Sequence, residues 1–136
     1  MTALEAAQRL AAVLREEAAD VVVGYDWHGG YGHPDHVKVH AVTRRAAGHD
    51  VGEWDPSQPM DDGNPLGSLE SELHWACDVS EFLEVKRSAL KAHASQSDAQ
   101  GMLQMPEEMF AVAFAWEHYI EPGRPDGMVS GWFLDG

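Results

Sequence analysis

The stretch that decides the fold runs from Val21 to His40 and reads VVVGYDWHGGYGHPDHVKVH. Its apolar start, Val21 to Tyr25, predicts a buried parallel strand, because such strands are rich in β-branched residues and apolar on both faces. Glycines then follow, and they allow positive φ and close backbone approach to a ligand. His33 and Pro34 predict the N-cap and first residue of a helix. Open α/β sheets bind ligands where a strand ends in this way.

The rest of the chain alternates helical and extended patterns. The residues at 49–67 are rich in Asp, Gly, Pro, Ser and Asn, and they predict a long surface loop. The other expected elements are a helix from Ala3 to Ala18, a helix at about 34–47 that stops at Gly48, a strand around 73–77, a helix that starts at an N-cap Ser80 and runs to about His93, a helix from Glu107 to about Trp116 after Pro106, an extended piece at 118–120 and a turn-rich tail.

Length and charge limit the classes of function. The chain has 136 residues, which suits one domain. Its formal net charge of -14 argues against binding to nucleic acid or to an anionic membrane surface, and favours small neutral or basic partners. A single cysteine, Cys77, and no signal-like or membrane-spanning run predict a cytoplasmic protein.

Three segments in the same order resemble one known family. Residues 21–36, with the core Gly29-Gly30-Tyr31-Gly32-His33-Pro34-Asp35-His36, resemble the second metal motif of the LmbE/PIG-L family of zinc-dependent N-deacetylases, in particular its mycothiol-pathway branch. Residues 86–96 and 105–120 resemble later segments of that family. The resemblance covers most of the chain. It implies a three-layer Rossmann-like α/β fold and hydrolysis of the acetamide of an N-acetylated amino-sugar conjugate.

The resemblance also implies a role for each residue of the motif. His36 would be a zinc ligand, and the positive end of the helix dipole disfavours the imidazolium that cannot bind metal. His33 would face the substrate, where it stabilises the oxyanion or protonates the departing amine. Tyr31 would lie near the oxyanion. Asp35 would orient a neighbouring histidine.

Substrate contacts are expected from the loop itself. Gly30 and Gly32 would let the backbone approach the substrate, while Asp26 is equally a substrate contact or a turn former. His40 lies four residues after His36 and is expected to lie too deep along the helix to bind the metal. His28 and His49 are expected to be solvated loop residues.

The sequence departs from the family at one motif. Full-length members begin with a strand followed by Ala-His-Pro-Asp-Asp-Glu, which supplies two more zinc ligands and the general base, whereas this chain has a single His-Pro-Asp at His33. Because catalytic zinc takes three protein ligands, we expect zinc to bind weakly or only with a complementary segment. The fold is then an incomplete, C-terminal portion with a sheet of about four strands and an uncovered edge, which favours a homo-oligomer. The alternative is a non-catalytic truncated descendant that serves as a binding or interaction module.

Overall fold

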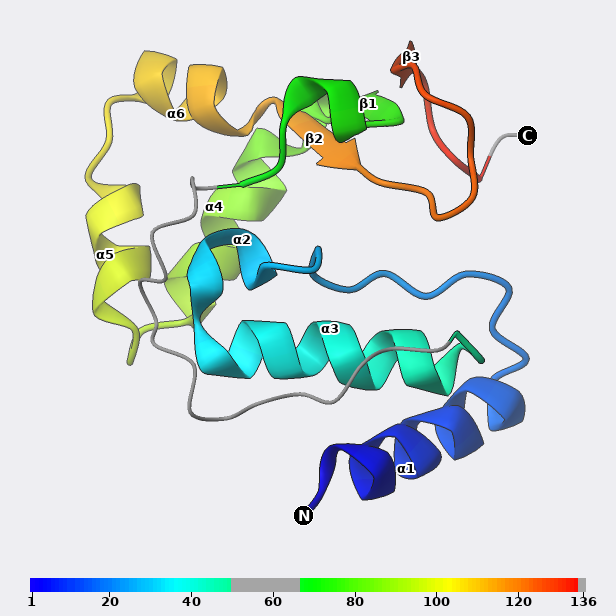
Figure 1. Cartoon of the computed structure of the whole chain (residues 1–136). Coiled ribbons are helices and arrows are strands. Elements are labelled where there is room, and N and C mark those ends of the chain that lie inside the picture. Colours follow the sequence, from blue (N-terminus) through cyan, green and yellow to red (C-terminus); the bar gives the residue numbers. More distant parts are fainter. Residues whose placement is uncertain (50–66, 135–136) are drawn as a thin grey trace. The chain divides into compact units, whose positions relative to one another are not determined.

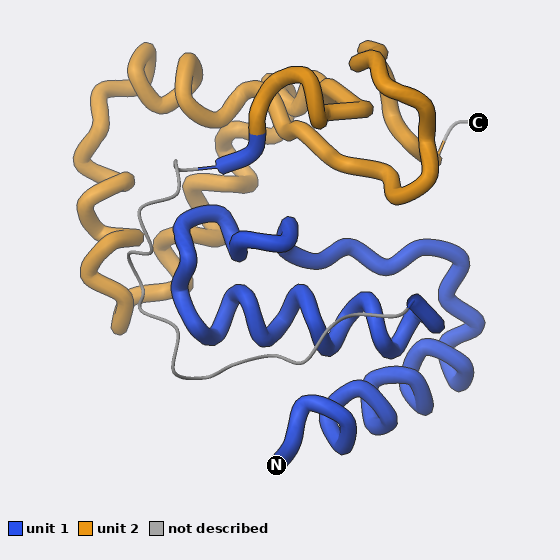
Figure 2. The backbone as a smooth tube through the Cα atoms, viewed as in Figure 1, with its two compact units in different colours: residues 1–68 blue, residues 69–136 orange. Residues whose placement is uncertain are grey.

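The computed structural model describes residues 1–49 and 67–134. These fall into two compact units, Met1–Ser68 and Leu69–Gly136, each with its own packing (Figure 2). Helices and a small sheet make up the chain, so the predicted mixed α/β class is confirmed (Figure 1). The loop predicted at 49–67 lies largely outside the described residues, and the single-domain organisation stays a prediction.

The first unit is built on two helices that pack side by side, α1 (Ala3–Glu16) and α3 (Pro34–Ala46) (Figure 1). A reciprocal capping box starts α1: the Thr2 hydroxyl accepts from the Glu5 N–H at 3.1 Å, and the Glu5 carboxylate accepts from the Thr2 N–H at 2.7 Å. His33 caps α3, and Gly48 follows its end with φ of +86°. The first helix was predicted from the helical spacing of its apolar residues and α3 from His33, Pro34 and Gly48, and both predictions are confirmed.

The predicted strand from Val21 to Tyr25 is wrong. These residues are not assigned to a strand, and Val21 and Val23 are 47% and 60% exposed. The segment instead follows α3. A Cβ added at Gly24 would lie 3.0 Å from Thr43 Cγ2, and the Tyr25 carbonyl accepts from His40 Nδ1 at 2.9 Å. A buried strand needs neighbouring strands for its hydrogen bonds, and the described part of this unit contains none.

The second unit contains a three-stranded sheet in the order β2-β1-β3. The central strand β1 (Trp75–Asp78) pairs antiparallel with β2 (Trp116–Tyr119) and parallel with β3 (Val129–Ser130). The strands expected around 73–77 and at 118–120 are therefore confirmed within one or two residues. The sheet has three strands within residues 67–134, rather than about four, and β3 lies in the tail that was predicted to hold turns.

Helical segments precede and follow the strands of this sheet along the chain. Their bounds are η1 (Glu70–Glu72), η2 (Ser80–Phe82), α4 (Leu83–Ala92), α5 (Ser97–Leu103) and α6 (Glu107–Phe114). The predicted N-cap at Ser80 is wrong, because Ser80 lies within η2 and its N–H donates to Asp78 Oδ1 at 2.9 Å. Val79 is the N-cap instead, and the Asp78 carboxylate at the end of β1 accepts from the first N–H of η2. The helix α5 was not predicted.

The core of the second unit is small. Phe110 of α6 is its largest fully buried side chain, and the Arg87 guanidinium lies over that ring at 4.4 Å from its centroid. The same guanidinium donates to the Met105 carbonyl at 2.8 Å, which joins α4 to the start of α6. Among the helices that the structure describes, none has the length and apolar composition needed to cross a membrane.

Candidate functional site

The glycine turn α2 (Gly29–Gly32) leads into α3 and is held by Asp26. Asp26 Oδ1 accepts from the Gly30 N–H, and Oδ2 accepts from the Ser68 hydroxyl, both at 2.8 Å. Burial alone would raise the pKa of Asp26, but these hydrogen bonds and one from the His28 N–H outweigh burial and lower it. Asp26 therefore stays ionised and acts as a turn former.

Only glycine fits at position 29, where the backbone of the turn lies against the start of α3. Its φ is +64°, and an added Cβ would lie 2.6 Å from His36 Cβ and 2.8 Å from the Val37 nitrogen. Real Cβ atoms do not approach other atoms so closely, so this position excludes any side chain. The close approach also brings the Gly29 carbonyl to the His36 ring.

His36, in the first turn of α3, has a defined tautomer. Its Nδ1 lies 3.0 Å from the Gly29 carbonyl oxygen. A carbonyl oxygen only accepts, so Nδ1 carries a proton, and in the neutral ring Nε2 is the unprotonated nitrogen. The Tyr25 ring stacks on this imidazole at 4.1 Å between centroids and 7° between planes. One hydrogen bond and one aromatic face thus orient a nitrogen lone pair that could bind a metal ion.

His33 has the opposite tautomer. Its Nδ1 accepts from the Asp35 N–H at 3.2 Å, so in the neutral ring Nε2 carries the proton. The contact from Asp35 to His33 is made by the backbone and not by the carboxylate. The two imidazole centroids lie 4.9 Å apart. In their neutral forms, the adjacent rings therefore differ: His36 offers a nitrogen lone pair, and His33 offers an N–H donor.

The loop tyrosine completes this cluster. Tyr31 meets the edge of His36 at 5.1 Å between centroids and is half exposed, so the structure brings Tyr31, His33 and His36 together. Gly32 is buried and has φ of +79°, as a tight turn requires. His40 uses Nδ1 to hold Tyr25 in place. Sequence reasoning missed Tyr25 as a support for His36, and its aromatic ring directly before the loop is the signal that points to it.

His28 and His49 were expected to be solvated loop residues. His49 is exposed, as predicted. His28 is 4% exposed, so the prediction for it is wrong. His28 immediately precedes α2 and its N–H contributes to lowering the Asp26 pKa, which places its backbone inside the folded turn.

These residues do not form a complete metal site. Within residues 1–49 and 67–134, no group of three or more His, Cys, Asp or Glu side chains is arranged to hold a metal ion. His36 has the orientation of a ligand, yet catalytic zinc takes three protein ligands and a water molecule. The described residues therefore fit one ligand position of such a site and not the whole of it.

Comparison with known proteins finds relatives that share one name. The chain is similar to proteins named 1D-myo-inositol 2-acetamido-2-deoxy-alpha-D-glucopyranoside deacetylase from several bacteria. It is 32% identical to that of Thermobifida fusca over 90% of this chain and 57% of the relative, and 35% identical to that of Mycobacterium sp. (strain KMS) over 96% and 52%. A shorter match, to the Nocardiopsis dassonvillei protein, is 62% identical over 31% of this chain and 15% of the relative.

The chain spans about half the length of the curated relatives it matches. No protein-family model matches it, and no solved structure matches it significantly.

Proposed function

We propose that this chain is the C-terminal portion of a zinc-dependent amidohydrolase of the LmbE/PIG-L family. It would remove the acetyl group from an N-acetylated amino-sugar conjugate, and it would be inactive alone. The observation that carries the proposal is the pair of adjacent imidazoles with opposite tautomers, His33 and His36, in a chain whose relatives are named as deacetylases. The proposal includes a three-layer Rossmann-like fold to which this chain contributes one part.

The chain's own residues then divide the work of amide hydrolysis. His33 Nε2–H would either donate to the acetamide oxygen as negative charge develops on it or, once the ring has taken up the proton that the attacking water releases, deliver a proton to the departing amine. Tyr31 lies beside this ring and adds a second donor for the oxyanion. Asp35 fixes the His33 tautomer through its N–H, while Gly30 and Gly32 shape the loop and Asp26 holds it.

Zinc is the cofactor that this proposal requires. When bound, it would polarise the carbonyl and activate the water. His36 provides one ligand, so the remaining ligands and the general base must come from a complementary segment. This requirement explains why the chain alone is expected to be inactive. Cytoplasmic location and homo-oligomerisation stay predictions of the sequence.

A reconstituted protein tests this function. The N-terminal part of the Thermobifida fusca relative is joined to this chain, and amine release from its amino-sugar inositol acetamide is followed together with zinc content. We expect zinc binding and hydrolysis by the fusion. We expect loss of both in His36→Ala, and loss of hydrolysis with retained zinc in His33→Ala. A fusion that binds zinc but releases no amine would refute the proposal, and His49→Ala serves as the matched control.

A second candidate is a non-catalytic interaction module. It is favoured by the exposed apolar row along residues 21–27, in which Val21, Val23, Tyr25 and Trp27 are each 46% to 60% exposed. Sedimentation of the pure chain would then show a dimer that Val23→Lys dissociates. Zinc-dependent hydrolysis by the pure chain, abolished by His36→Ala, would contradict this candidate and the expected inactivity alike.

A further inference from the structure

The second unit contains a cavity of about 550 Å³ at the end of its sheet. It is lined by the last three residues of β1, the first two of β2, Val79 just before η2 and Phe82 at its end, and the end of β3 with the two residues that follow it. The Cys77 thiol donates to the Gly131 carbonyl at 2.9 Å, and burial raises the pKa of that thiol. The thiol is therefore uncharged at neutral pH, and the space is large enough for a small organic molecule.

Aromatic side chains dominate the walls. Trp116, Trp132 and Phe82 all line the cavity and remain 38% to 55% exposed. Trp132 is held in place by its neighbours, with centroid distances of 4.5 Å to Phe133 and 6.3 Å to Tyr119. The electron-rich faces of such rings attract organic cations, most strongly the indole of tryptophan.

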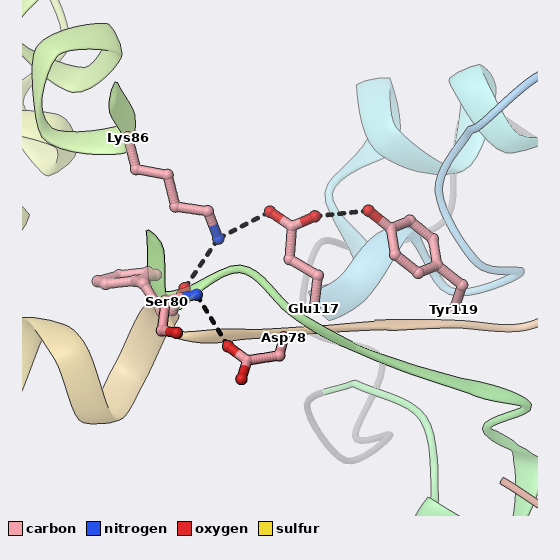
Figure 3. A network of polar contacts seen from close by, with 6 residues as sticks. Asp78, Ser80, Lys86, Glu117 and Tyr119 are labelled. Carbon is pink, nitrogen blue, oxygen red and sulfur yellow. Dashed lines mark hydrogen bonds and ion pairs between the residues drawn. The ribbon is translucent and has the colours of Figure 1, made fainter. Parts of the chain in front are cut away.

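Two residues that line the cavity have carboxylates, which project from opposite faces of the sheet because Asp78 pairs with Trp116 and Glu117 pairs with Cys77. Glu117 is neutralised: one oxygen contacts Lys86 Nζ at 2.7 Å and the other accepts from the Tyr119 hydroxyl (Figure 3). Asp78 accepts only hydrogen bonds from Ser80, which lower its pKa and keep it ionised at neutral pH (Figure 3). The cavity wall thus carries one negative charge that no cation of this network balances.

Strand register brings that charge next to an aromatic ring. Asp78 and Trp116 are direct partners across the β1–β2 pair, so their side chains project from the same face of the sheet. We propose that this cavity binds a small organic cation with an apolar body, such as an alkylated ammonium, whose charge lies between the Asp78 carboxylate and the Trp116 indole. This site does not rest on the deacetylase proposal, because it uses none of the residues that the proposal assigns to catalysis, zinc binding or substrate binding.

Choline and its neutral isostere, in which a tert-butyl group replaces the trimethylammonium group, test the proposal on the whole chain. The indole N–H signals of the five tryptophans are followed by NMR. Choline should shift the Trp116 and Trp132 signals saturably and leave that of Trp27 unchanged, and the isostere should bind at least about fivefold more weakly. Equal binding of the two compounds, or no shift at Trp116 and Trp132, would overturn the proposal.

Matched variants separate charge from packing. Asp78→Asn keeps an oxygen for the Ser80 N–H and should raise the Kd for choline by about two- to fivefold, whereas Asp126→Asn removes an equal charge outside the cavity and should not. Trp116→Leu should weaken choline binding by a similar factor and leave the isostere unaffected. Equal effects of Asp78→Asn and Asp126→Asn would refute a local site.

Discussion

Gly29→Ala should destabilise the first unit by about 2 to 5 kcal/mol. The new side chain must adopt φ of +64°, a left-handed conformation that costs an alanine about 1–2 kcal/mol. Its Cβ would also lie 2.6 Å from His36 Cβ and 2.8 Å from the Val37 nitrogen, and relieving such overlap in a packed region costs about 1–3 kcal/mol. Because the Val37 contact is with the backbone, a rotamer change cannot remove it. The start of α3 must move away from the turn, which also breaks the bond from His36 to the Gly29 carbonyl.

Gly48→Ala is the matched control at the other end of α3. Its φ of +86° imposes a similar backbone cost, but a Cβ there meets nothing within 4 Å. The difference between the two variants therefore isolates the steric overlap, at about 1–3 kcal/mol. Hydrogen exchange of the α3 amides measures both free energies, and the NMR signals of the His36 ring report its displacement. If Gly29→Ala costs no more than Gly48→Ala, the close approach of turn and helix is refuted.

Three further predictions address other contacts. Tyr25→Leu should cost about 0.5–1.5 kcal/mol by removing the stacked ring and should broaden the His36 ring signals, and unchanged signals would contradict the stacking. The Lys86 contact lowers the pKa of Glu117, so its contribution to stability is present above the usual pKa of 4.5 and is lost as the pH falls through the lower, folded value. Urea unfolding between pH 7 and 3 should show this acid loss, and Glu117→Gln should reduce it. Thr2→Ala should reduce helix stability by about 1 kcal/mol, measured by exchange of the α1 amides.

Local signals explain which elements of the fold could be predicted. The start of α3 was predictable because His33 and Pro34 fix it within two residues, and Gly48 fixes its end in the same way. The extended segment Val21–Tyr25 was not, because a strand depends on partners that its own sequence does not contain. β3 was not predicted for the same reason, since its two residues form a strand only by pairing with β1. The short helix α5 contains Gly101, which weakens the helical pattern.

The candidate site likewise has features that local sequence predicts and features that depend on the folded structure. The sequence motif identified His33, His36 and Tyr31, and the structure brings the three rings together. The two tautomers could not be predicted, because they depend on which backbone atom each Nδ1 meets after folding. The stacking of Tyr25 on His36 likewise depends on the path of residues 21–25 along α3. The prediction of a buried strand there did not include this path.

The half of the site that this chain contains depends mainly on short-range contacts. His36 is oriented by Gly29 and Tyr25, and His33 by the Asp35 N–H, all within one continuous stretch. None of these contacts uses a strand pair, so the paired imidazoles form although Val21–Tyr25 has no strand partner among the described residues. The segment that complements the chain in the proposed enzyme therefore has to contribute ligands and a base, and it does not have to orient these two rings.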